Sequence, residues 1–511
     1  MDKRDSGDVG SGDGVVQDID SSQIASLAVA AMLWSALKQW GGRILSIVVF
    51  AVLARTLAPE DFGLVALAAV FIGFLEVPLR VSLGDALVQR KVLRDIELDS
   101  AFWGLFGASV LLAAGLAATA PWIGSGSDTP GVAPLIMALA LSLPLTGISV
   151  VPQAILRRQM RFKTLTVRRL SADLVAGVVA IGLALAGAGV WALVAKSILQ
   201  SIVLTGLAMA TVDWRPRLRF QWSALREIAT FGAWSVGNSV VGFANRHVDD
   251  LVIGFMLGAV ALGYYVVAFQ LLTIAVLLVT NTIESAALSA FSRVGADRDR
   301  VGRGVTIALR ANMLVVTAIS ALTIALAPSI TLIMFGSQWL PSAGLVRILI
   351  VGSLMAPIAS LAVTVMKSSG RPDLTLKVAI PNTVILVVLM VSTVPLGLYW
   401  VSSARIFLLG LFVPINLYFL HRLCDVRWHS VAATFAKTAV VGLAAGAVAV
   451  ATIGSWTDAT DSLARFSVAV LAGGIVYVLG ILAMARSELR ELWAFFRRRN
   501  NRAGVPVAGA A

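Results

Sequence analysis

Fourteen apolar stretches, each long enough to cross a lipid bilayer, constrain this chain more than any other feature. A membrane-spanning helix needs about 20 mainly apolar residues to cross a hydrocarbon core of roughly 30 Å. The composition agrees, because 58% of the 511 residues are hydrophobic and only 14% are charged, which excludes a soluble protein of ordinary makeup. We therefore predict an all-α, polytopic membrane protein with about 14 transmembrane helices, at 30–56, 62–83, 98–121, 132–155, 170–187, 189–211, 229–256, 260–289, 304–327, 342–365, 376–395, 397–420, 431–453 and 464–485.

Basic residues in the connecting loops predict the orientation of the chain. Clusters of Arg and Lys occur in every second loop, as at 157–163 and 215–219, whereas intervening loops such as 121–130 and 335–341 contain neither. Cytoplasmic loops of membrane proteins carry an excess of Lys and Arg. With an even number of spans, both termini are predicted to be cytoplasmic.

The formal net charge of +13 is spread over these short clusters rather than gathered on one polar domain. This pattern favours membrane lipids with anionic headgroups as partners and argues against nucleic acid. Residues 1–25, rich in Asp, Gly and Ser, are predicted to form a disordered cytoplasmic tail. Residues 486–511 are predicted to form a basic cytoplasmic tail that contains an interfacial helix.

An internal repeat with an offset of 200 predicts the domain organisation. The matched pairs are Trp34/Trp234, Ser35/Ser235, Gly42/Gly242, Leu57/Leu257, Gly63/Gly263 and Ala68/Ala268. Because six spans separate the two copies, they run in the same direction, as in parallel repeats related by an axis along the membrane normal. We predict an N-lobe at 26–211, a cytoplasmic linker at 212–228, a C-lobe at 229–422 and two accessory helices at 423–485.

Charged residues inside spans are the candidate functional residues, because such charges are costly and normally face a bundle interior or a wet cavity. In the first span, Gln39 and Arg43 are four residues apart and share a helix face, and Lys38 lies roughly 100° from Gln39. These three are the leading candidates for substrate contact. A packing role, or a Lys38 side chain that reaches the interface, is the alternative.

The seventh span repeats this pattern. Arg246 and Asp250 are four residues apart, and Asn245 and Asp249 form the adjacent pair. Arg246 is a candidate for binding phosphate, and Asp249 or Asp250 is a candidate for taking up a coupling proton or cation. An internal ion pair between Arg246 and Asp250 is the alternative.

The remaining charged candidates lie in other spans. Lys196, Arg347 and Arg405 are predicted at intermediate depths, where they would give a central cavity a positive excess. Glu76 lies nearer a cytoplasmic end, where a gating salt bridge and simple interfacial solvation are both open. His247 is the one histidine within a span, and Cys424 is the one cysteine, so neither a metal site nor another cofactor is predicted.

Several segments resemble the polysaccharide transporter family. They are ARTLAPEDFGLVALA (Ala54 to Ala68), GDALVQRK (Gly84 to Lys91), LRRQMRFK (Leu156 to Lys163), GAGVWALV (Gly187 to Val194), LGAVALGYY (Leu257 to Tyr265), FGSQW (Phe335 to Trp339) and SSGRPD (Ser368 to Asp373). The family includes colanic-acid-type exporters and belongs to the superfamily of the multidrug and toxin extrusion transporters and the lipid II flippase. Arg80 is a departure, since such relatives typically have an acidic residue there.

The resemblance implies two lobes that work by alternating access. It implies translocation of an undecaprenyl-diphosphate-linked oligosaccharide across the bacterial inner membrane, for exopolysaccharide, capsule or lipopolysaccharide synthesis. The implied protein is a transporter and not an enzyme, and a polysaccharide polymerase or co-polymerase is an expected partner.

Two other functions stay open. A drug or cation antiporter of the same superfamily would need an acidic cavity, whereas the charges here lean basic. A membrane glycosyltransferase or polymerase is suggested by the acidic pair Glu60 and Asp61, but these residues suit the first turn of a helix that follows Pro59, and no outer loop is long enough for a catalytic domain.

Overall fold

A computed structural model describes residues 41–42, 44–90, 93–126, 129, 131–274, 298–369, 371–426, 428–454, 462–486 and 488–490. The predicted tail at 1–25, the substrate candidates Lys38, Gln39 and Arg43, and nearly all of the predicted C-terminal interfacial helix lie outside these residues.

The described chain consists of helices joined by short connections. An unlabelled helix, Ile44–Thr56, precedes α2. The others are α2 (Pro59–Ser82), α3 (Gly84–Gln89), α4 (Asp95–Gly126), α5 (Val132–Ala140), α6 (Ser142–Arg158), α7 (Phe162–Leu185), α8 (Trp191–Thr211), α9 (Trp222–Met256), α10 (Gly258–Leu272), α12 (Arg298–Phe335), η2 (Ser337–Trp339), α13 (Leu340–Ser353), α14 (Ala356–Ser368), α15 (Pro372–Thr393), η3 (Val394–Leu396), α16 (Leu398–Cys424), α17 (Trp428–Ile453) and α18 (Ser462–Met484).

Among the described residues, nine helices are long and apolar enough to cross a membrane, or ten if α13 and α14, which meet at a 42° bend, count as one span. The helix Ile44–Thr56 and α10 are shorter apolar helices. α7 and α9, with 24 and 35 residues, are outside that set and carry several charged side chains. Each predicted span overlaps a described helix, while the total of 14 and the side on which the termini lie stay predictions.

Two tight turns show how the sequence starts α2 and α10. Pro59 occupies the first turn of α2, and the Asp61 carboxylate accepts a hydrogen bond from the Ala58 backbone N–H at 3.0 Å. At the matching place 200 residues on, Gly258 begins α10 with a φ of +84°, a left-handed conformation that glycine adopts without steric cost.

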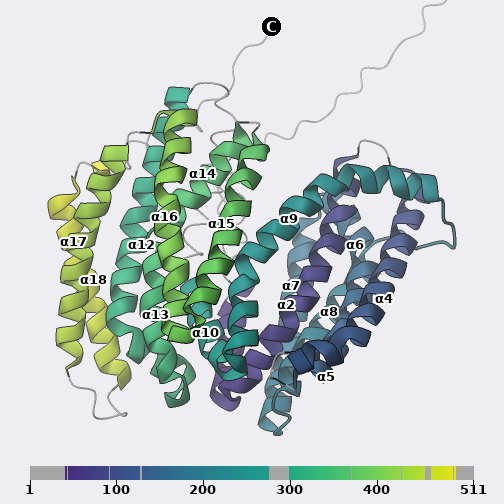
Figure 1. Ribbon diagram of the computed structural model, residues 1–511, viewed down its shortest axis with the longest axis horizontal. Coiled ribbons are helices and arrows are strands. Elements are labelled where there is room, and N and C mark those ends of the chain that lie inside the picture. The colour runs from purple at the N-terminus through teal and green to yellow at the C-terminus, as the bar shows by residue number, and fades with distance from the viewer. Residues whose placement is uncertain are drawn as a thin grey trace, which may run out of the picture.

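The helices form two groups (Figure 1). The first group contains α2 to α8, the second contains α10 to α18, and the long α9 runs from the first to the second. Within the first group α7 packs on α8 and α4 on α6, and within the second α12 packs on α17 and α17 on α18. The groups meet where α2 packs against α10 and α9.

The contact between α2 and α10 is reciprocal. A Cβ placed on Gly63 would lie 1.7 Å from the Ala259 carbonyl oxygen, and one on Gly263 would lie 1.9 Å from the Pro59 carbonyl oxygen. Gly63 and Gly263 differ by 200 in number, as do Pro59 and Ala259. The same offset that relates the two sequence repeats therefore also relates the two halves of this contact.

Polar side chains reinforce the junction beside this contact. The Trp339 indole N–H and the Gln338 amide N–H donate to the Ala54 carbonyl oxygen at 2.6 and 2.7 Å. Arg55 reaches back and donates to the carbonyl oxygens of Ile333 and Met334. Trp339 is fully buried, with its ring edge-on to Phe62. We call Arg55, Gln338 and Trp339 the junction residues.

Candidate functional site

A polar cavity of about 770 Å³ opens within the first group of helices. Its walls come from Gly42, from the helix Ile44–Thr56, and from α2, α6, α7 and α8. Five cationic side chains line it, against a single acidic lining residue, Asp173, among the residues that the structure describes. The cations are Arg80, Arg157, Arg168, Arg169 and Lys196. We call this space the cationic cavity.

Arg168 of α7 is the most unusual of these cations. It is only 5% exposed, and its Nε and Nη1 atoms have no hydrogen-bond partner among the described residues. Removing a charge from water without a partner is costly, and an uncompensated buried charge normally indicates a missing counter-charge. Arg168 therefore lines the cavity as a cationic side chain whose nitrogen atoms are available to bind an anion.

Neighbouring acids neutralise part of the remaining charge. Arg80 donates to the Glu76 carboxylate from Nε at 2.9 Å, and Glu76 also accepts a hydrogen bond from the Thr146 hydroxyl of α6 at 2.8 Å. Arg169 lies 3.9 Å from Asp173, which also accepts a hydrogen bond from the Gln200 amide of α8. Each acid thus has defined partners, and the cavity keeps a cationic excess.

Lys196 was expected in a central cavity between the lobes, whereas it lies on α8 in the wall of this cavity, within the first helix group. Arg168 and Arg169 were not singled out because the fifth span was predicted to start at residue 170, whereas α7 begins at Phe162. The i, i+4 spacing of Arg169 and Asp173 was the available signal that the helix starts earlier.

The second group of helices holds a buried ionic cluster. Asp249 of α9 is 1% exposed and accepts hydrogen bonds from Arg405 Nη1 of α16 at 2.6 Å and from the Tyr265 hydroxyl of α10. The Arg405 guanidinium also lies 5.5 Å from the centre of the Phe269 ring. These contacts join three helices through one carboxylate.

The neighbouring residue on α9 has a different partner. Asp250 contacts the His247 ring, with 2.8 Å between Oδ2 and Nδ1, and among the described side chains no ion pair joins it to Arg246. Asn245, five residues before Asp250, donates to Asn382 and to Thr383 of α15, both at 2.9 Å. The polar face predicted on the seventh span is therefore present, but its partners are His247 and α15 rather than Arg246.

Two candidates lie apart from both clusters. Arg246 is exposed, and Arg347 is exposed and donates from Nε to the Ile324 carbonyl oxygen of α12 at 3.1 Å. The described residues contain no group of three His, Cys, Asp or Glu side chains that could hold a metal ion. Apart from these two, the described site candidates occur at or beside the cationic cavity or the Asp249 cluster.

This helical architecture defines the class of the protein as a multi-pass membrane protein with the fold of known transporters. A lipid II flippase, MurJ, in an inward closed conformation, matches with a TM-score of 0.72 at 16% identity, over 89% of this chain and 100% of that one. An inward-facing multidrug resistance transporter of the MATE family matches with a TM-score of 0.60 at 16% identity, over 75% and 95%. At these identities the likeness shows the fold alone.

Residues 52–344, more than half of the chain, match the family described as polysaccharide biosynthesis protein, and the chain belongs to that family. Succinoglycan biosynthesis transport protein ExoT of Rhizobium meliloti is 27% identical over 60% of this chain and 62% of its own length, which is less than two thirds. Teichuronic acid biosynthesis protein TuaB of Bacillus subtilis is 23% identical, over 67% and 71%. Lipopolysaccharide biosynthesis protein WzxC of Escherichia coli is 23% identical, over 50% and 53%.

Proposed function

We propose that this chain is a flippase of the bacterial inner membrane that moves undecaprenyl-diphosphate-linked oligosaccharide repeat units from the cytoplasmic to the periplasmic leaflet. The products would serve exopolysaccharide, capsule or lipopolysaccharide synthesis. The observation that carries this proposal is the cationic cavity, in which Arg168 is buried with two nitrogen atoms that have no partner in the described part of the chain. The family and the relatives named for polysaccharide synthesis and transport support the substrate class.

The diphosphate is the part of such a substrate that fits this cavity. Its negative charge is concentrated, and a guanidinium holds phosphate oxygens in a bidentate manner while an ammonium acts as a point charge. In the proposal, Arg168 and Lys196 contact the diphosphate from α7 and α8. Gly42 lines the same cavity. Lys38, Gln39 and Arg43, which lie outside the described residues, stay in the proposal as further contacts.

The junction between the helix groups supports alternating access as the mechanism. The short connection at 57–58 lies at the end of the molecule that loop charges predict to be periplasmic, and the reciprocal α2–α10 contact and the junction residues lie beside it. In the proposal, these contacts close the periplasmic end. Separating the two groups there would release the substrate to the outer leaflet.

Coupling is assigned to α9. Asp249 is held by Arg405 and Tyr265, whereas the partner of Asp250 is His247, which is itself titratable. We assign uptake of a coupling proton or cation to Asp250, with Asp249 keeping α9, α10 and α16 together. Glu76, hydrogen-bonded to Arg80 and Thr146, would sense the charge of the cationic cavity and act in gating. A polymerase or co-polymerase stays a proposed partner.

The competing functions fit the cavity less well. An exporter of organic cations would face five cationic lining side chains and one acidic one, so its substrate would be repelled. For a glycosyltransferase, the pair Glu60 and Asp61 would have to be free for catalysis, but Asp61 accepts the backbone N–H of Ala58 at the start of α2.

The test is transport by an Arg168→Gln variant in reconstituted proteoliposomes, with binding of inorganic diphosphate as a second readout. Loss of a buried, hydrogen-bonded charge contact costs about 2–5 kcal/mol, so we expect a fall of roughly thirtyfold or more in diphosphate affinity and a comparable fall in transport. The matched control is Arg161→Gln, since Arg161 is exposed, donates to the Thr211 carbonyl oxygen and is not among the residues that line the cavity. Equal transport and binding in both variants would overturn the assignment.

A further inference from the structure

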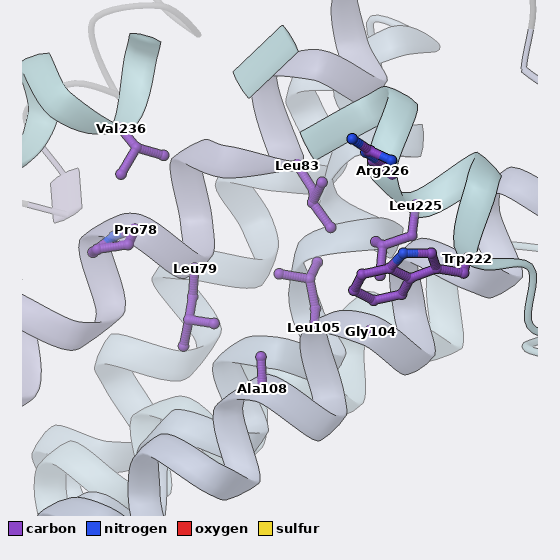
Figure 2. Close-up of a pocket in the computed structure, with 10 residues that line it drawn as sticks. All are labelled: Pro78, Leu79, Leu83, Gly104, Leu105, Ala108, Trp222, Leu225, Arg226 and Val236. Atoms are coloured by element: carbon purple, nitrogen blue, oxygen red, sulfur yellow. The ribbon is translucent and has the colours of Figure 1, made fainter. Parts of the chain in front are cut away.

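A second, apolar pocket of about 390 Å³ lies between α2, α4 and α9 (Figure 2). Leu79 faces it from α2, Leu83 from the residue after α2, Leu105 from α4 and Leu225 from α9. Apolar walls of this kind favour binding of a hydrocarbon chain and provide few hydrogen-bonding groups for a sugar or an ion.

Two small residues on α4 leave room for this pocket between the helices. Gly104 and Ala108 are one helical turn apart and both line the pocket. α9 approaches so closely that a Cβ on Gly104 would lie 2.8 Å from a terminal carbon of Leu225. A larger side chain at Ala108 would therefore occupy the pocket itself.

The pocket lies at the end of the helices where the basic linker is attached. Next to Gly104, the Trp103 indole N–H donates to the Arg217 carbonyl oxygen at 2.8 Å, and Ser100 accepts the Gln221 backbone N–H at 2.9 Å. Trp222, which is 67% exposed, and Arg226 stand at the rim. An aromatic and a cationic side chain beside a basic segment are typical of the headgroup level of a membrane.

The cationic cavity lies on a neighbouring face of the same helix. Arg80 lines the cationic cavity, whereas Leu79, the preceding residue and thus about 100° away around α2, lines the apolar pocket. One amphiphile with an anionic head and a hydrocarbon chain matches this pair of sites.

We infer that the apolar pocket holds a stretch of the polyprenyl chain of the lipid diphosphate while its diphosphate occupies the cationic cavity. This inference rests on the proposed function, because its ligand is the proposed substrate. The chain and the diphosphate thus bind independently measurable sites, and the pocket selects a lipid diphosphate over a free anion.

The experiment compares two probes on the full-length protein in nanodiscs of neutral lipid: inorganic diphosphate, which has no chain, and farnesyl diphosphate, which has a short one. Burial of each CH₂ contributes about 0.8 kcal/mol, so a few buried groups give wild type at least a roughly tenfold preference for the farnesyl probe. In Ala108→Trp we expect that preference to fall to near one, with unchanged affinity for inorganic diphosphate, which also verifies folding. The control is Ala118→Trp, on an exposed part of α4.

Each outcome decides a separate claim. A farnesyl preference that survives in Ala108→Trp overturns the pocket assignment, as does displacement of the farnesyl probe by phosphatidylglycerol, which would mean that bulk lipid fills the pocket. A photoreactive farnesyl diphosphate should label peptides of α2, α4 or α9, and labelling only elsewhere also overturns it. Failure of the proposed function appears differently, as unchanged inorganic diphosphate affinity in Arg168→Gln.

Discussion

Arg168 and Arg405 are both buried arginines, yet their surroundings differ in a way that separates binding from structure. Arg405 donates to Asp249 at 2.6 Å and stabilises a contact among three helices. Arg168 leaves two nitrogen atoms without a partner among the described residues. A buried charge that is paired with a counter-charge is neutral for stability or adds modestly to it. A buried charge without a counter-charge lowers stability, and such residues are typical of functional sites.

A stability measurement tests this difference. Arg168→Met replaces an uncompensated buried cation with an apolar chain of similar length, so we expect the free energy of unfolding in detergent to rise by on the order of 1 kcal/mol while transport is lost. Thermal unfolding of the purified variant, beside Arg161→Met as the exposed control, measures the shift. Destabilisation by Arg168→Met would mean that the guanidinium stabilises the helix packing instead.

Residue partners of this kind were the least predictable part of the site. The sequence places Asp249 and Arg405 in separate spans 156 residues apart, and periodicity within one helix says nothing about which helix lies opposite. The prediction that charges within spans face the interior was useful for Lys196, Asp249 and Arg405, but it also selected Arg246 and Arg347, which are exposed.

At the scale of elements, hydrophobic periodicity located the helices because a span needs a long apolar run, and every predicted run overlaps a described helix. An apolar run does not include the polar end of a helix. The predicted fifth span therefore starts eight residues after the beginning of α7. The bend between α13 and α14 also carries no hydropathy signal. Trp339, which lies between two predicted spans, is fully buried in the junction.

The reciprocal packing of α2 and α10 makes a prediction for paired variants. In Gly63→Ala and Gly263→Ala, the new methyl group overlaps a backbone oxygen that cannot move aside easily, so we expect each to destabilise the closed conformation by about 1–3 kcal/mol or more, and by similar amounts. Gly242→Ala is the control, because nothing lies within 4 Å of a Cβ there. Unfolding midpoints for the three purified variants measure this, and a neutral Gly63→Ala would contradict the tight contact.

At the scale of the whole molecule, the two helix groups are joined at one end by contacts that each contribute little free energy. The junction residues donate hydrogen bonds to backbone carbonyl groups across the groups, rather than forming buried ion pairs. Each such bond contributes only about 0.5–1.5 kcal/mol net, which suits a contact that would open and close in the proposed transport cycle. The apolar pocket and the cationic cavity lie away from this junction, so a substrate can bind while it stays closed.

Trp339→Phe tests whether this junction sets the balance between closed and open conformations. The variant keeps an aromatic ring against Phe62 but loses the indole N–H that donates to the Ala54 carbonyl oxygen. Loss of one hydrogen bond should raise the open population roughly two- to tenfold. We would measure it in the Cys424→Ser background as labelling of Ala54→Cys, which is fully buried here, by a membrane-impermeant thiol reagent from the periplasmic side. Trp400→Phe, at an exposed tryptophan, is the control, and equal labelling in both variants would show that Trp339 does not keep the predicted periplasmic end closed.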